Sequence, residues 1–376
     1  DNQNIQKREE IWRRYSLPET YHFSAHSLLS SAIATWPEAP IVLLREHYRC
    51  HPKIINFCNQ KFYGGKLIVM TEDHEESDVL TMYRTAPGNH ARGHLNQRQI
   101  DVIRQEVLPS LERQGYGSIG IITPYRDQVV AIQTQLGKEL EVATVHKFQG
   151  REKDAIVLTS VDNVITDFVD DPRMLNVAVS RAVKSLTVVT SQDPQNDRTN
   201  YGDLARYIEY NNCAVIESAV SSVFDLLYQG YAEQRRAFLK KHGRVSEYDS
   251  ENLAYAVIQN ILQKAEFSFV DCAAHVSLVN LVKDYSMLTE EETVYARNHL
   301  THVDFLLFRR MDKSPLLAIE VDGVAFHAAG SIQAGRDEKK NRIFELCGIP
   351  LLRLRTDGSG EKERMEQALL AAVSNS

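Results

Sequence analysis

The sequence lacks the features that define several classes of protein. No run of apolar residues approaches the roughly 18 that a membrane-spanning helix needs, and DNQNIQKREE at the start does not resemble a signal peptide. The five cysteines are scattered and form no CxxC pair, which argues against both a disulfide framework and a zinc knuckle. These absences predict a cytoplasmic protein with no membrane partner.

An excess of positive charge is also missing. The net charge of −7 has the wrong sign for a protein that coats nucleic acid, so any contact with DNA is expected to be local. A hydrophobic content of 43% and a charged content of 25% are ordinary for a globular chain. The length of 376 residues predicts two domains, or three.

The first half of the chain alternates short β-branched runs with helical segments, which predicts a mostly parallel sheet. A polar stretch at 191–203 interrupts the alternation, and a new helical region begins near residue 215, where we place the domain boundary. The expected strands cover 117–125, 142–150, 154–161 and 185–191, and the expected helices cover 127–136, 174–182 and 204–211.

In the second half, carboxylates lie within or directly after apolar runs. Asp304 lies inside THVDFLLF, and Glu320 and Asp322 end LLAIEVDG. Residues two apart on a strand face the same side, and a hairpin of 303–308 with 316–322 would bring Asp304 beside the other two. Buried carboxylates require compensation, and Mg²⁺ prefers such oxygen ligands and retains waters that can attack a phosphodiester.

Residues that follow these carboxylates could complete a hydrolytic site. His327 could act as a general base or a leaving-group acid, although a structural or DNA-contacting role fits it equally well. Arg336 and Lys340 share one face of an expected helix over Arg336–Cys347, where they could stabilise charge on a phosphate. A solvated surface pair is the alternative for Glu320 and Asp322.

This half resembles the PD-(D/E)xK nuclease superfamily, most closely the branch near very-short-patch-repair endonucleases, over residues 215–360. The resemblance implies a restriction-endonuclease-like α/β/α fold and Mg²⁺ or Mn²⁺ as the cofactor. It implies metal ligands at Asp304, Glu320 and Asp322, and adds Glu251, which is otherwise an ordinary acid at a helix start. Asp322 occupies the usual lysine position, so Lys339 or Lys340 supplies the cation, or the site works without one.

Four segments of the first half carry a different pattern, namely LREHYRCHPKIINFCNQKFYGGKL (44–67), ITPYRDQ (122–128), TVHKFQGREKDAIVLTSV (144–161) and LNVAVSRA (175–182). In this order they resemble motifs IV, V and VI of superfamily 1 helicases of the nonsense-decay type, over residues 40–190. The resemblance implies a RecA-like domain.

The helicase resemblance assigns roles to matching positions. Arg49 and Arg181 would reach the γ-phosphate of ATP, and Glu152 would contact the ribose or organise the arginines. The remaining positions would couple nucleotide state to the bound strand or contact nucleic acid directly, where hydroxyls position the backbone without reading sequence. The coupling residues are Gln149 and Gly150, and the nucleic-acid-binding residues are Thr123, Thr144 and Asn176.

The chain has no GxxxxGK[ST] loop to hold phosphates and no acidic strand of the DExx type before Arg49. We therefore expect a C-terminal fragment or one part of a split protein, which alone binds ATP weakly and does not hydrolyse it. The other half of the ATP site would come from a missing N-terminal RecA-like domain or from a separate ATPase chain.

The predicted fold class is α/β, with a RecA-like parallel-sheet domain over 1–215 followed by a restriction-endonuclease-like α/β/α domain over 216–376. The predicted function is the C-terminal portion of an ATP-dependent DNA helicase–nuclease, suited to defence against foreign DNA or to DNA repair. The alternatives are an inactive nuclease fold that binds DNA, or an assembly subunit that docks a separate ATPase. DNA is the expected partner, and a homo-oligomer is a further expectation.

Overall fold

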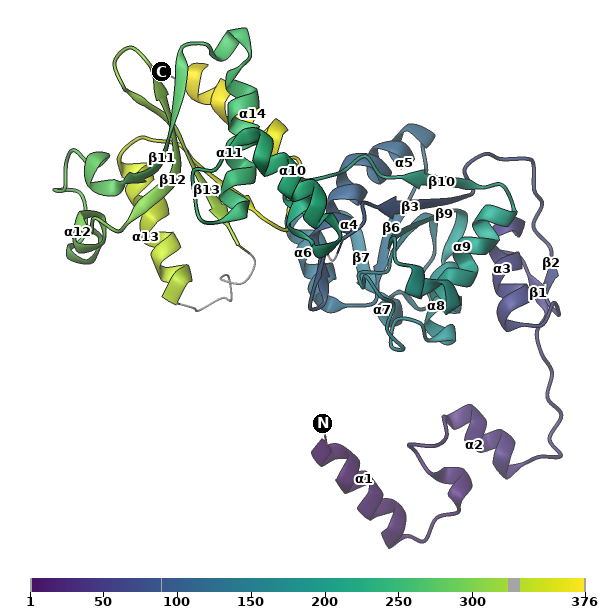
Figure 1. The fold of residues 1–376 in the computed structure, drawn as a ribbon. Helices are drawn as coiled ribbons and strands as arrows, with labels where there is room; N and C mark the ends of the chain where they lie inside the picture. Colours follow the sequence, from purple (N-terminus) through teal and green to yellow (C-terminus); the bar gives the residue numbers. More distant parts are fainter. Residues whose placement is uncertain (1, 89, 324–331, 375–376) are drawn as a thin grey trace. The chain divides into compact units, whose positions relative to one another are not determined.

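The computed structural model describes residues 2–88, 90–323 and 332–374 (Figure 1). The chain divides between Glu46 and His47 into two compact units, a small N-terminal unit and a larger one that holds the sheets described below. The small unit was expected to be part of the first domain. Its elements are α1 (Asn2–Arg14), η1 (Glu19–Tyr21) and α2 (Leu28–Thr35).

The first sheet of the larger unit has six strands in the order β10-β3-β9-β8-β6-β7, and every neighbouring pair is parallel. Parallel strands covered on both faces read as continuous apolar runs, and the central strands of this sheet fit that rule. The strands are β3 (Leu80–Thr85), β6 (Ile119–Thr123), β7 (Glu141–Thr144), β8 (Lys153–Thr159), β9 (Ala182–Ser191) and β10 (Ala214–Glu217).

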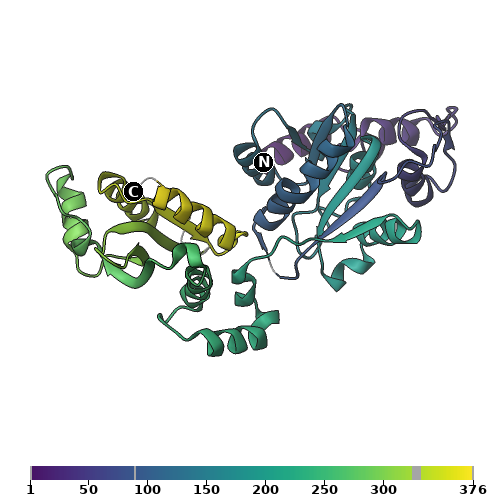
Figure 2. The ribbon, with the colours of Figure 1, turned by 90° about the horizontal axis from the view of Figure 1, so that it is seen from above.

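Helices cover both faces of this sheet (Figures 1 and 2). One core cluster joins the sheet to α3, α8 and α9, and a second joins its other face to α4, α5 and α6. This arrangement confirms the predicted RecA-like parallel-sheet domain. The helices are α3 (Pro52–Phe62), α4 (Gln97–Val102), the π-helix η2 (Ile103–Val107), α5 (Leu108–Gln114), α6 (Arg126–Leu136), α7 (Val145–Phe148), α8 (Pro172–Val179), η3 (Pro194–Arg198) and α9 (Asn200–Tyr210).

Most of the strands predicted for this half are confirmed, but the expected strand over 142–150 is wrong beyond Thr144. The short helix α7 follows instead, with Thr144 as its N-cap residue. Val145 and Phe148, three positions apart, share one face of this helical turn and are both buried in the same core cluster. Short strand pairs complete this part: β1 (Glu46–His47) with β2 (Ile68–Val69), and β4 (Ala91–Arg92) with β5 (Leu95–Asn96).

The second sheet has four strands in the order β11-β12-β13-β14. The predicted hairpin is confirmed, because β12 and β13 pair antiparallel with Phe305 opposite Ile319. The outer strand β14 runs parallel to β13, and β11 pairs antiparallel with β12. The strands are β11 (Val270–Ser277), β12 (His302–Arg309), β13 (Pro315–Asp322) and β14 (Leu351–Arg355).

One face of this sheet packs on α11 and α14, and the other packs on α13. The resulting α/β/α layering is compatible with the expected restriction-endonuclease-like fold. The helices here are η4 (Val223–Leu227), η5 (Gln229–Tyr231), α10 (Ala232–His242), α11 (Asp249–Leu262), η6 (Ala265–Phe267), η7 (Leu278–Asn280), α12 (Glu290–Arg297), α13 (Ile332–Leu346) and α14 (Glu361–Ser374).

Helix α13 begins four residues before the expected Arg336 and ends near the expected position, followed by Gly348 with a φ of +67°. Glycine adopts this left-handed conformation at little cost, which explains why the helix stops there. Among the described residues, none of the helices combines the length and the hydropathy that crossing a membrane requires.

Candidate functional site

Asp304 and Glu320 lie where β12 and β13 diverge. The paired register of the hairpin ends at Phe305 and Ile319, and these two acids are the next residues along each strand. Both side chains are buried, with 9% of Asp304 and 6% of Glu320 exposed. The Val321 amide donates a hydrogen bond of 2.7 Å to Asp304 Oδ2. The local strand pattern is therefore sufficient to bring the two predicted carboxylates together.

Lys340 reaches this pair from α13. Its Nζ donates hydrogen bonds to Glu320 Oε2 at 2.8 Å and to the His302 carbonyl at 2.9 Å, and its side chain is buried. Lys339, the other lysine that the sequence offered, instead forms an ion pair with Glu291 on α12, 2.6 Å away. The structure thus places Lys340, and not Lys339, beside the carboxylates.

The charges in this site do not balance. Burial raises the pKa of Glu320 to about 7, and the Asp304 carboxylate adds to the rise while Lys340 opposes it. Burial also raises the pKa of Asp304, and the Glu251 carboxylate contributes to that rise. Among the described residues, Glu320 Oε1 and Glu251 Oε2 are buried without a hydrogen-bond partner. Unsatisfied buried carboxylate oxygens are what a divalent cation would compensate, so the residues present fit such an ion.

Asp322, the third carboxylate predicted for this site, forms an ion pair with Arg353. Asp322 accepts a hydrogen bond of 2.8 Å from Arg353 Nη1, and the same guanidinium lies 3.3 Å from Asp337. Arg336 is exposed in the first turns of α13. His327 lies outside the described residues. Arg353 was not predicted from the sequence, because its position opposite Glu320 depends on β14 pairing with β13.

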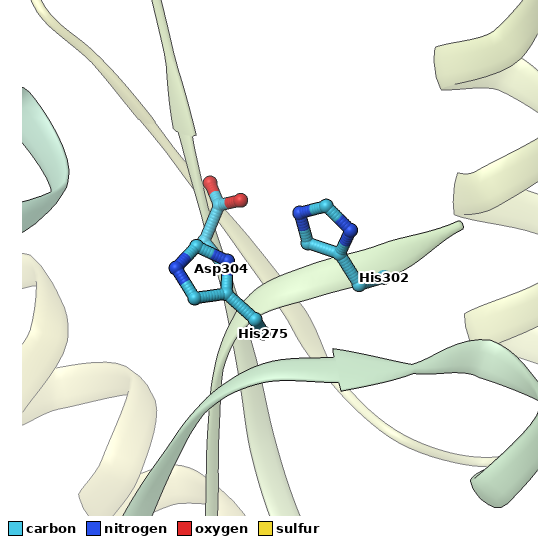
Figure 3. A group of neighbouring side chains, drawn as sticks. All are labelled: His275, His302 and Asp304. Atoms are coloured by element: carbon cyan, nitrogen blue, oxygen red, sulfur yellow. The ribbon is translucent and has the colours of Figure 1, made fainter. Parts of the chain in front are cut away.

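Two histidines that sequence reasoning missed lie beside Asp304. One ligand atom each from His275, His302 and Asp304 lies within 4.8 Å of the others, and Figure 3 shows the three side chains turned toward a common space. His302 precedes Asp304 by two residues in β12, a spacing that could have been noticed in THVDF. His275 comes from β11, where its φ is +52°, and no local pattern links it to Asp304.

The predicted nucleotide-facing residues of the first sheet also converge. Arg49, just before α3, forms an ion pair with Glu152 in the loop before β8. Burial lowers the pKa of Arg181, and the positive charge of Arg49 lowers it further. Arg181 Nε donates to the Val177 carbonyl at 3.1 Å, which orients its guanidinium. Two arginines with one carboxylate between them leave net positive charge, which favours an anionic ligand.

The remaining predicted positions of the first sheet differ in exposure. Gln149 and Gly150 are exposed in the loop after α7, and Gly150 has a φ of +82°. Thr123 is fully buried, so its hydroxyl does not reach the surface in this structure. Thr144 is half-buried, and the Asn176 amide donates to the Tyr63 hydroxyl at 3.0 Å.

Three rings from separate segments stack on one another, with Tyr125, in the turn after Thr123, between the other two. His94 and Tyr125 stack with centroids 4.3 Å apart at an interplanar angle of 11°, and Phe168 stacks on Tyr125 at 5.6 Å. Phe168 is 52% exposed. Stacked, accessible rings are the surface on which unpaired bases bind without sequence preference. The sequence did not reveal this stack, because its three rings come from separate segments of the chain.

The two sheets match different protein families. Residues 24–193 match the family described as an AAA domain. Residues 247–373 match a family described only as a protein of unknown function, DUF2726. The first match thus places an AAA domain in the half that holds the parallel sheet, whereas the second match names no activity.

Some curated relatives of this chain are named as DNA helicases. The chain is 30% identical over 187 residues to the 5′-3′ DNA helicase ZGRF1 of Mus musculus, which is 45% of this chain and 10% of that protein. It is 26% identical over 204 residues to a regulator of nonsense transcripts 1 homolog of Arabidopsis thaliana, covering 46% and 16%. It is 27% identical over 202 residues to the DNA polymerase alpha-associated DNA helicase A of Saccharomyces cerevisiae, covering 43% and 29%.

The chain thus spans between a tenth and three tenths of these relatives. A solved structure titled as the C-terminal domain of a possible DNA helicase from Lactobacillus plantarum is 18% identical and covers 42% of this chain and 96% of that one. Its TM-score is 0.30, too low to bear on the fold.

Proposed function

We propose that this chain is part of an ATP-dependent DNA helicase–nuclease. Its four-stranded sheet hydrolyses DNA phosphodiester bonds with a divalent metal, Mg²⁺ or Mn²⁺. Its six-stranded sheet contributes arginines to an ATP site whose phosphate-binding loop lies in another domain or chain. The observation that carries the nuclease assignment is the buried cluster of Asp304, Glu320 and Lys340.

The cluster suits hydrolysis because its parts have complementary tasks. Asp304 and Glu320 would hold the ion, which supplies an activated water and stabilises charge on the phosphate. Lys340 keeps Glu320 in place and offers a positive charge near the phosphate or the attacking water. Two buried carboxylates with one ammonium are costly without a ligand, so the arrangement is easier to explain by binding than by stability.

The nuclease proposal is tested by incubating the full chain with Mg²⁺ or Mn²⁺ and linear, nicked or single-stranded DNA. We expect cleavage, and we expect Glu320→Gln to reduce its rate by about 100-fold or more, because the metal loses a charged ligand. Glu338→Gln, which changes an exposed carboxylate of α13, is the control and should retain activity. Cleavage at an equal rate by Glu320→Gln, or none with either metal, would contradict the proposal.

A DNA-binding module without activity is the second candidate. It is favoured by the ion pair of Asp322 with Arg353, which leaves fewer carboxylates for a metal than the sequence predicted. DNA binding without cleavage, together with no heat of binding for Mg²⁺ or Mn²⁺, would support the module over the nuclease.

The motor assignment rests on Arg49, Arg181 and Glu152, and on relatives that are named as DNA helicases. The partners we propose are DNA and a Walker-containing ATPase half, either in the same protein or as a separate chain that this one docks. A cytoplasmic role in defence against foreign DNA or in DNA repair suits such a combination.

For the motor, we predict that mixing the chain with a Walker-containing ATPase half gives DNA-stimulated ATP hydrolysis. Arg181→Ala should lower that hydrolysis by about 100-fold or more, since an arginine that stabilises the transferring phosphoryl group contributes on that scale. Arg173→Ala, which removes an exposed arginine from α8, is the matched control. Unchanged hydrolysis in Arg181→Ala would refute the assignment.

A further inference from the structure

The cluster of His275, His302 and Asp304 contains two imidazoles, which is unusual for a site meant for Mg²⁺. Their ligand atoms lie within 4.8 Å of one another, and the two rings meet edge to face with centroids 5.1 Å apart. Figure 3 shows the side chains extending from neighbouring strands into one space. The distances are those of groups able to contact one ion together.

His302 is held in the tautomer that a metal requires. Its Nδ1 lies 3.0 Å from the Leu300 carbonyl oxygen. A carbonyl only accepts hydrogen bonds, so Nδ1 carries the proton and Nε2 keeps its lone pair. A backbone carbonyl on one ring nitrogen is the usual way in which a protein orients a metal-binding histidine.

Glu251 does the equivalent for His275. Its carboxylate is 9% exposed, and its Oε2 has no hydrogen-bond partner among the described residues but lies 3.5 Å from His275 Nε2. A carboxylate facing one nitrogen of an imidazole orients the ring and increases its basicity. The pairing with Glu251 thus orients His275 within the cluster, as the Leu300 carbonyl orients His302.

A second group of residues that could bind a metal lacks a histidine in the required tautomer. His51, Asp73 and Glu76 also lie close together. However, His51 Nδ1 accepts a hydrogen bond of 3.1 Å from the Lys53 amide, so its Nε2 carries the proton and donates to Glu76. Neither nitrogen of His51 is left for a metal, and the two acids are exposed.

We propose that His275, His302 and Asp304 form a mixed imidazole–carboxylate site that takes a first-row transition ion, such as Mn²⁺ or Co²⁺, in preference to Mg²⁺. Mg²⁺ requires oxygen ligands in near-octahedral geometry, whereas imidazole favours the transition ions. Asp304 belongs to both this site and the carboxylate pair. The inference rests on the proposed nuclease for its catalytic meaning, but not for the binding itself.

The test measures Co²⁺ binding to the full chain by calorimetry and by the visible absorption of the ion. Both measurements are made in the presence of about a 100-fold excess of Mg²⁺. We expect one Co²⁺ per chain to be retained. His302→Ala and His275→Ala should each weaken Co²⁺ binding by about tenfold or more and alter the absorption bands, because imidazole ligands are lost. His299→Ala removes an exposed histidine three residues before His302 and should behave like the wild type.

Displacement of Co²⁺ by this excess of Mg²⁺ would overturn the inference, as would wild-type Co²⁺ affinity in both histidine variants. Circular dichroism of His302→Gln and His302→Ala shows whether either variant is misfolded, so that a loss of Co²⁺ binding due to misfolding can be recognised. The nuclease proposal fails independently of this one: Co²⁺ binding without cleavage would contradict the nuclease alone. Mg²⁺-supported cleavage without Co²⁺ preference would contradict the transition-metal site alone.

Discussion

Glu320 and Lys340 are buried together and carry opposite charges, but their ion pair leaves one carboxylate oxygen of Glu320 unsatisfied. One oxygen of Glu320 bonds to Lys340 Nζ at 2.8 Å, while the other has no hydrogen-bond partner among the described residues. The neighbouring Asp304 carboxylate opposes ionisation of Glu320. At the scale of residues, the site therefore holds buried charge that its own side chains do not fully compensate.

This electrostatic conflict predicts how stability depends on pH. Because burial raises the pKa of Glu320 to about 7, the folded chain holds a proton there between about pH 4.5 and 7 that the unfolded chain has released. The contribution of this group is therefore fully present below pH 4.5 and is lost as the pH rises through 7. The loss should amount to about 3 kcal/mol at most.

The measurement is urea unfolding in EDTA at pH 5 and at pH 8. Glu320→Gln should flatten the difference between the two free energies of unfolding, whereas Glu338→Gln should leave it as in the wild type. Equal pH dependence in the wild type and in Glu320→Gln would show that Glu320 ionises normally in the folded chain.

At the scale of elements, α9 shows how tightly a helix start is packed against the segment before it. Thr199 caps the helix, and its hydroxyl accepts a hydrogen bond from the Gly202 amide at 3.0 Å. The preceding η3 brings its backbone so close that a Cβ at Gly202 would lie 2.3 Å from the Asn196 carbonyl oxygen. Only glycine fits this position, because a backbone carbonyl cannot move aside as a flexible side chain does.

We predict that Gly202→Ala lowers the free energy of unfolding by about 2 kcal/mol, since the added methyl group overpacks a rigid contact. Gly335→Ala is a matched change in α13, where nothing lies within 4 Å of the new Cβ. Ala should there stabilise the helix by up to about 1 kcal/mol. Thermal unfolding of both variants gives the comparison, and a rise in the melting temperature of Gly202→Ala would contradict it.

At the scale of the whole molecule, a buried arginine connects segments that are distant in the sequence. Arg98, on α4, is 1% exposed and makes two hydrogen bonds to Asp225, at 2.9 and 2.8 Å. It also donates to the Gly358 carbonyl after β14 at 3.3 Å, and His90 Nε2 lies 3.0 Å from the same aspartate. The network thus ties the six-stranded sheet to residues of the second half.

We predict that Arg98→Met destabilises the chain by about 3–5 kcal/mol, because it leaves Asp225 buried without its cation. Arg104→Met removes a half-exposed arginine that pairs with the buried Asp101, which still accepts hydrogen bonds from Gln97 and Ser359, so this change should cost only about 1 kcal/mol. Chemical unfolding of the two variants measures the difference. A loss in Arg98→Met no larger than in Arg104→Met would show that the network contributes little.

The sequence by itself determined the parallel sheet, the β12–β13 hairpin and the closeness of Asp304 to Glu320. The alternation of apolar and polar residues along a strand and the turn residues between strands are local properties, so they can be recognised in the sequence. It did not predict α7. A run of β-branched residues predicts a strand, and it does not show that a helical turn buries the side chains of this segment better than a strand would. Nor did it indicate that residues 1–46 form a unit of their own.

Only the tertiary structure decided between Lys339 and Lys340, paired Asp322 with Arg353, and brought His275 to Asp304. Each of these contacts depends on the rotation of a docked helix or on the register of a strand far away in the sequence. A shift of one residue in either would present a different side chain. The residues that hold a charge or an ion are thus chosen by packing between elements, which no local pattern records.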